Sequence, residues 1–116
     1  MSNFKYIVWG TLTFLLAQTV VWYQLNLQFI SEWAKNNKWA MSLMGIPISY
    51  IYLYATEWTV KGFDGELWPG RLIGFATGMV AFAALTWLHM NQSITPKTAV
   101  TLALATAIVV IQIVWK

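Results

Sequence analysis

The sequence predicts an all-α integral membrane protein, a single domain in which four transmembrane helices form a bundle with short loops. Hydrophobic residues make up 59% of the chain and charged residues only 9%, whereas charged residues make up about 25% of ordinary soluble domains. A soluble domain of 116 residues leaves much of its surface in water and could not hide so much apolar area. We therefore expect lipid to surround most of the protein.

Tryptophan spacing is the second observation behind this prediction. Nineteen residue steps separate Trp68 from Trp87, and the same number separates Trp39 from Trp58. At about 1.5 Å per helical residue each interval is about 28 Å long, close to the hydrocarbon thickness of about 30 Å in a bilayer. All eight tryptophans fall at or near predicted helix ends or in the first loop, where indole rings prefer to lie. The predicted spans are residues 4–28, 39–59, 68–90 and 96–115.

The first span is too long for the core of a cleaved signal peptide, so we expect it to be retained. Gln18 lies near its middle and should point into the bundle, where another polar group can satisfy its amide. Residues 24–29 alternate polar and apolar side chains, which is typical of a strand. A single strand at a membrane edge would lack backbone partners, so we expect a helix end there, followed by a polar loop at 31–38.

Proline and glycine set the remaining helix boundaries. Gly45 and Pro47 interrupt the second span, and a kink is expected near Leu43 because Pro47 cannot donate a backbone hydrogen bond. Residues 59–67 read as a polar loop, after which Pro69 fits the first turn of the third span. Thr95 is a capping residue before the fourth span. An even number of spans places both termini on one side together with the second loop, and the basic residues divide four against three between the two sides, which leaves the orientation open.

Two helical faces of small residues predict close helix packing. Glycine recurs every fourth residue in the third span, and alanine does so in the fourth. Such faces allow association within the chain or between chains, although glycine is also generally enriched in membrane helices. The predicted packing residues are Gly70, Gly74, Gly78, Ala99, Ala103 and Ala107.

A tyrosine-lined face that leads to a carboxylate is the candidate ligand site. Tyr50, Tyr54, Glu57 and Lys61 follow one another at helical spacing. An acid within a span together with tyrosine rings would suit an organic cation or a proton. The alternative interpretation is an interfacial Glu57–Lys61 ion pair with tyrosines at headgroup level.

Arg71 requires a compensating anion because it lies at a helix N-terminus. We expect an ion pair with Glu57 that closes the hairpin of the second and third spans, and Asp64, Glu66 or a lipid phosphate are the alternatives. His89, near the other end of the third span, could move protons or could simply lie at headgroup level.

Composition also excludes several classes of protein. The chain has no cysteine and one histidine, so thiolate metal sites and haem ligation by two histidines of one chain are ruled out. We expect no metal, no cofactor and no catalytic residues, because no set of acid, base and nucleophile lies at membrane depth. The net charge of +3 suits anionic headgroups rather than nucleic acid, because no basic stripe is present.

The layout of the four short spans resembles the small multidrug resistance proteins and, more broadly, the four-helix members of the drug/metabolite transporter superfamily. The runs 18–23 and 67–78 are similar to four-helix relatives that lack the glutamate of the first helix. The resemblance implies a homodimer, often antiparallel, in a bacterial or bacteriophage-encoded inner-membrane protein. In that family the first three helices line a shared cavity and the fourth helps to dimerise. Proton-coupled exporters of the family carry a glutamate in the middle of the first helix, where this chain has Gln18.

The sequence therefore predicts a dimeric carrier of a small amphipathic or cationic solute that works by alternating access. Gly45 and Pro47 would let the second span flex. A structural or accessory subunit of a larger membrane assembly is the alternative, since the same small-residue faces could dock onto other chains. The residues predicted to contact the solute are Gln18, Trp22, Tyr50, Tyr54 and Glu57.

Overall fold

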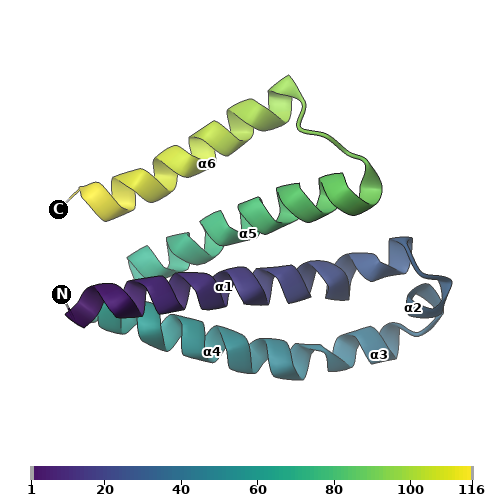
Figure 1. Cartoon of the computed structure of the whole chain (residues 1–116), viewed down its shortest axis with the longest axis horizontal. Helices are drawn as coiled ribbons and strands as arrows, with labels where there is room; N and C mark the ends of the chain where they lie inside the picture. Colours follow the sequence, from purple (N-terminus) through teal and green to yellow (C-terminus); the bar gives the residue numbers. More distant parts are fainter. Residues whose placement is uncertain (1, 116) are drawn as a thin grey trace.

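Every regular element in the computed structural model, which describes residues 2–115, is a helix (Figure 1). The prediction of an all-α fold is therefore confirmed for these residues. The elements in chain order are α1 (Ser2–Asn26), the 3₁₀-helix η1 (Leu27–Phe29), α2 (Glu32–Asn36), α3 (Lys38–Leu43), α4 (Gly45–Gly62), α5 (Trp68–Met90) and α6 (Pro96–Val114).

Three helices are long and apolar enough to cross a membrane, namely Asn3–Phe29, Trp68–Met90 and Pro96–Val114. The second predicted span does not join them. It is divided at Met44 into α3 and α4, as Pro47 predicts, because proline offers no N–H to a carbonyl one turn earlier. In addition, α4 carries Glu57 and Lys61 near its end. A bundle of four spans is thus not confirmed by helix length and composition.

Side-chain caps begin two of the helices, α2 and α6. Thr95 accepts a hydrogen bond from the backbone N–H of Thr98 at the start of α6, as its type predicts. Residues 24–29 are helical and η1 follows directly on α1, so these residues form no strand despite their alternating pattern. The predicted loop at 31–38 contains the short helix α2, whose N-cap Ser31 accepts a hydrogen bond from Ala34. The next loop is shorter than predicted because α4 continues to Gly62.

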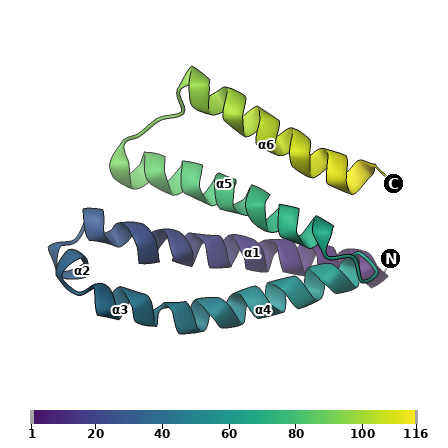
Figure 2. The same ribbon diagram turned by 180° about the vertical axis from the view of Figure 1, so that it is seen from behind.

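The long helices lie side by side in the order α6, α5, α1, α4 (Figures 1 and 2). α1 packs against α4 on one side and against α5 on the other, while α6 packs against α5. The molecule measures 47 × 36 × 18 Å, and a helix with its side chains is about 10–12 Å across. One chain is therefore a flat layer. The start of α1 and the end of α6 lie at the same end of this layer as the α4–α5 connection.

The closest helix contact joins α1 to α4. A Cβ added to Gly10 would lie 2.5 Å from Thr59 Cγ2 and 3.2 Å from the Ala55 carbonyl oxygen. At the other end of the contact, a Cβ added to Gly62 would lie 2.9 Å from the backbone nitrogen of Ile7. Two backbones approach this closely only where side chains are small or absent. Small residues on both helices therefore determine the α1–α4 packing.

The glycine face of α5 packs within the chain, against α1 and α4. A Cβ on Gly70 would meet the Thr59 hydroxyl at 2.5 Å, and one on Gly78 would meet the Gln18 amide at 3.0 Å. Gly74 lies between them and faces the ring of Phe14 at 3.3 Å. The sequence allows these glycines to pack either within one chain or between chains, and the structure shows packing within one chain.

The alanine face of α6 points elsewhere. Ala99, Ala103 and Ala107 are all exposed, whereas Ala105 is buried against α5. The α5–α6 contact thus uses a different side of α6, and the predicted alanine face is open in one chain.

Candidate functional site

A cavity of about 750 Å³ lies between α1, α4 and α5, at the end of the layer where α4 runs into α5. Ligand-binding cavities are typically about 300–1,000 Å³, so this space suits a small molecule. We refer to it as the central cavity. Its lining residues are Phe14, Gln18, Tyr52, Thr56, Thr59, Val60, Leu67, Trp68, Gly70, Arg71, Leu72, Gly74 and Phe75.

Gln18 forms a polar contact between α1 and α5 at the central cavity. Its Nε2 donates a hydrogen bond of 3.0 Å to the carbonyl oxygen of Gly74, which also accepts one from the Thr77 hydroxyl. The absence of a side chain at Gly78 makes room for the amide. Gln18 is only partly buried, and no buried side-chain polar atom in residues 3–115 lacks a partner. Its second amide N–H and its carbonyl oxygen form no other hydrogen bond among the described residues.

Tyr52 and Thr56 come from one face of α4 and line the cavity with Thr59. They are spaced four and three residues apart, so they share a helical face. The Tyr52 ring lies 6.0 Å from the Phe14 ring, which joins α4 to α1. The Thr59 side chain is fully buried, and its hydroxyl donates to the carbonyl oxygens of Ala55 and Thr56. The cavity wall thus contains hydroxyl groups beside aromatic and aliphatic surface.

Arg71 is the charged residue of the central cavity, and the structure does not pair it with Glu57. Glu57 instead lies 3.9 Å from Lys61 Nζ, with both side chains about half exposed. This is the alternative i, i+4 pair, and surface pairs of this kind contribute only about 0–1 kcal/mol to stability. It is the single ion pair in the part of the chain that the structure describes. Arg71 lies in the first turn of α5, as predicted, but the expected Glu57–Arg71 ion pair is not formed, because Glu57 pairs with Lys61 instead.

Four of the five predicted solute contacts lie outside the central cavity. Tyr50 and Tyr54 are 63% and 53% exposed and, like Glu57, point away from it. Trp22 is buried nearer the other end of α1. Only Gln18 lines the cavity, so the structure does not bring the five predicted residues together within one chain.

Trp22 belongs to a second polar cluster, which joins α1 to the end of α5. Its Nε1 donates a hydrogen bond of 3.0 Å to the Thr86 hydroxyl, and its ring stacks on His89 with a centroid distance of 5.3 Å. The Tyr23 hydroxyl lies 2.8 Å from His89 Nε2. These contacts give His89 a clear packing role in holding α5 against α1.

Replacing Trp22 by phenylalanine should destabilise the protein by about 1–2 kcal/mol. Trp22 is 3% exposed, and the change removes both its hydrogen bond to Thr86 and part of its stacking surface. The free energy of unfolding in detergent micelles, followed by circular dichroism, measures this loss. Trp87 is 64% exposed, so Trp87→Phe is the matched control and should change stability by less than about 0.5 kcal/mol. Equal losses in the two variants would contradict the role of the Trp22 hydrogen bond.

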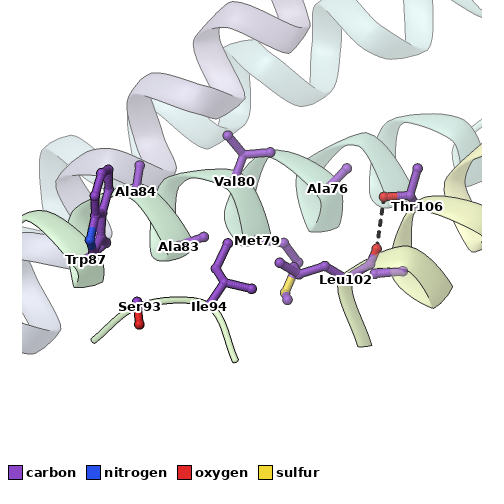
Figure 3. Close-up of a pocket in the computed structure, with 11 residues that line it drawn as sticks. Ala76, Met79, Val80, Ala83, Ala84, Trp87, Ser93, Ile94, Leu102 and Thr106 are labelled. Atoms are coloured by element: carbon purple, nitrogen blue, oxygen red, sulfur yellow. Dashed lines mark hydrogen bonds between the residues drawn. The ribbon is translucent and has the colours of Figure 1, made fainter. Parts of the chain in front are cut away.

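A second cavity, of about 610 Å³, lies between α5 and α6 and is almost entirely apolar (Figure 3). The Thr106 hydroxyl in its wall already donates to the carbonyl oxygen of Leu102, as the dashed line shows. No charged side chain lines this cavity. It can contact hydrocarbon, but it lacks the convergent polar groups that orient a solute. The labelled wall residues include Ala76, Met79, Val80, Ala83, Ala84, Trp87, Ser93 and Ile94.

Residues 2–115 contain no group of three histidine, aspartate or glutamate side chains that could hold a metal ion. Comparison of the chain with protein-family models, with curated proteins and with solved structures finds no match in any of the three. Fold and site together define an all-helical protein with three helices able to cross a membrane. Its central cavity combines one positively charged side chain, that of Arg71, with several hydrogen-bonding groups and apolar surface.

Proposed function

We propose that the chain is a four-span membrane protein and that two copies form a carrier for a small amphipathic solute. Large apolar side chains are exposed along all four long helices, for example Leu16, Leu53, Val80 and Leu104, and lipid is the environment in which such a surface is stable. α3 and α4 together run from Lys38 to Gly62, about 36 Å at helical rise, which is enough to cross about 30 Å of hydrocarbon.

The central cavity is the observation that carries the carrier proposal. A packing subunit needs only apolar faces, whereas this cavity places Gln18, Tyr52 and Thr56 beside aromatic and aliphatic side chains. Polar groups that interrupt helix packing within a membrane are costly and usually serve a function. The broken α3–α4 segment supplies a point where the cavity wall can bend, as in carriers that expose a site to each side in turn.

Dimerisation is supported by the incomplete packing of one chain. α6 packs on α5, while its face formed by Ala99, Ala103 and Ala107 stays exposed. A small-residue face of this kind suits close contact with a second transmembrane helix. A second copy of the chain supplies such a helix, and the proposed homodimer would use this face of α6.

Transport by the purified protein tests the proposal. Proteoliposomes of phosphatidylcholine should take up radiolabelled taurocholate or ethidium faster than protein-free vesicles do. Gln18→Leu should lower the uptake rate about tenfold, because it removes the polar contact to Gly74 and the free amide groups from the cavity. Glu57→Gln should leave the rate unchanged, since Glu57 lies outside the cavity and pairs with Lys61.

Gln112→Leu is the matched control for Gln18→Leu, because it replaces the same side chain on α6, outside both cavities. It should not reduce uptake. Equal loss in the Gln18 and Gln112 variants would contradict the assignment of the site. If neither solute moves faster than in protein-free vesicles, the alternative of an accessory subunit is favoured, and the open alanine face of α6 would then bind a different membrane protein.

A further inference from the structure

The electrostatic character of the central cavity comes from Arg71, the one charged side chain among its lining residues. The carboxylates near this end of the molecule are engaged elsewhere or lie outside the cavity wall. Glu57 pairs with Lys61, and Asp64 accepts a hydrogen bond of 2.7 Å from Asn3 Nδ2. Within residues 2–115 no carboxylate forms an ion pair with Arg71. The cavity therefore presents a positive charge that the chain itself does not neutralise.

The neighbouring polar groups can also bind an anion. Gln18 keeps one amide N–H that is not used in its bond to Gly74. Tyr52 and Thr56 contribute hydroxyl groups, and an arginine guanidinium offers five N–H donors in a planar fork that fits a carboxylate or phosphate. The remaining wall is apolar and includes Phe14, Leu72 and Phe75.

We propose that the central cavity binds an amphipathic anion. Its carboxylate or phosphate head would pair with Arg71, and its hydrocarbon part would lie against the apolar wall. The inference rests on the proposed carrier function and names the class of its solute. It replaces the expectation of a cationic solute, because that expectation depended on Glu57, which the structure places outside the cavity.

Two sources could supply this chemistry, an anionic phospholipid of the surrounding membrane or a single-chain carboxylate. Arg71 lies in the first turn of α5, three residues after Trp68, which is the depth of lipid headgroups in the proposed topology. Both ligands would place a charged oxygen at this depth and hydrocarbon deeper in the bilayer.

Equilibrium binding to the dimer in phosphatidylcholine nanodiscs tests the proposal. Radiolabelled dodecanoate should bind saturably, and dodecyltrimethylammonium should bind more weakly, because it has the same chain and the opposite charge. Arg71→Gln should weaken dodecanoate binding about tenfold, as expected for the loss of one charge-assisted pair near the surface. Lys61→Gln removes the same charge at the same end of the molecule, outside the cavity, and should leave binding unchanged. Equal affinity of wild type and Arg71→Gln, or tighter binding of the cationic amphiphile, would overturn the proposal.

Nanodiscs that contain added phosphatidylglycerol distinguish the two sources. Displacement of dodecanoate by this lipid identifies a lipid phosphate as the occupant, whereas undisturbed binding identifies the single-chain carboxylate. Either result supports an anion site, provided that Arg71→Gln weakens the binding measured.

A measurement on the unchanged protein guards against a folding defect in the Arg71 variant. Dodecanoate with a photoreactive group at the end of its chain should label Phe14, Leu72 or Phe75. Labelling confined to the α5–α6 cavity would overturn the proposal. Binding that depends on Arg71 without any transport would contradict the carrier function but not this inference. Uptake of ethidium without anion binding would contradict this inference but not the carrier function.

Discussion

Gly10→Ala should strongly destabilise the protein, although it adds only one carbon. The added Cβ would lie 2.5 Å from Thr59 Cγ2, 3.0 Å from the Thr59 backbone nitrogen and 3.2 Å from the Ala55 carbonyl oxygen. Two of these neighbours belong to backbone, so the clash cannot be relieved by rotating a side chain. α1 would have to move away from α4 along the closest contact of the fold. We expect a loss of about 3 kcal/mol in the free energy of unfolding in micelles, the upper part of the usual range for overpacking.

Gly45→Ala is the matched control. An added Cβ there would have one neighbour, Gln24 Nε2, at an ordinary contact distance of 3.6 Å. Since alanine favours a helix over glycine by about 1 kcal/mol, this variant should be as stable as the parent or more so. Gly62→Ala should behave like Gly10→Ala, because its Cβ would lie 2.9 Å from the Ile7 backbone nitrogen. If Gly10→Ala and Gly45→Ala are equally stable, α1 and α4 do not approach as closely as the structure shows.

The α1–α4 contact also shows what the sequence could not predict about the fold. In α5 three glycines recur at a four-residue spacing, so their common face is visible in the sequence. The contact between α1 and α4 instead joins two single glycines, Gly10 and Gly62, to residues far away in the chain. Gly62 moreover lies in a segment whose charged residues read as a loop, although α4 continues through it. Which isolated glycine meets which partner is decided by tertiary packing.

The candidate site was predictable only in part, for a related reason. Gln18 could be identified because an amide in the middle of an apolar span needs a polar partner. On α4, two faces carry tyrosine and hydroxyl or acidic groups at helical spacing, one with Tyr50 and Glu57 and the other with Tyr52 and Thr56. The face of α4 that packs toward α1 becomes the cavity wall. The spacing of residues within α4 does not show which of the two faces this is. Thr59 continues the face of Tyr52 and Thr56 at helical spacing, and this small residue is the sequence signal that could have identified that face.

Gly74→Leu should destabilise the single chain by about 3 kcal/mol or more. Even one added carbon would lie 3.3 Å from the Phe14 ring, and leucine brings three further carbons into the α1–α5 contact. The Gly74 carbonyl would also be pushed away from Gln18, which breaks the hydrogen bond that crosses this contact. Unfolding in micelles measures the effect, and the variant should lose stability at protein concentrations where no dimer forms.

Ala103→Leu provides the comparison that separates packing within the chain from packing between chains. Ala103 is exposed on α6, so leucine there should change the stability of the monomer by less than about 0.5 kcal/mol. In the proposed dimer it would separate two α6 helices, and the dimer fraction in lipid should fall. A stable, monomeric Gly74→Leu protein would show that the glycine face joins chains rather than helices of one chain. An Ala103→Leu protein with an unchanged dimer fraction would exclude the alanine face as the interface, because two α6 helices packed through Ala103 have no room for the larger side chain.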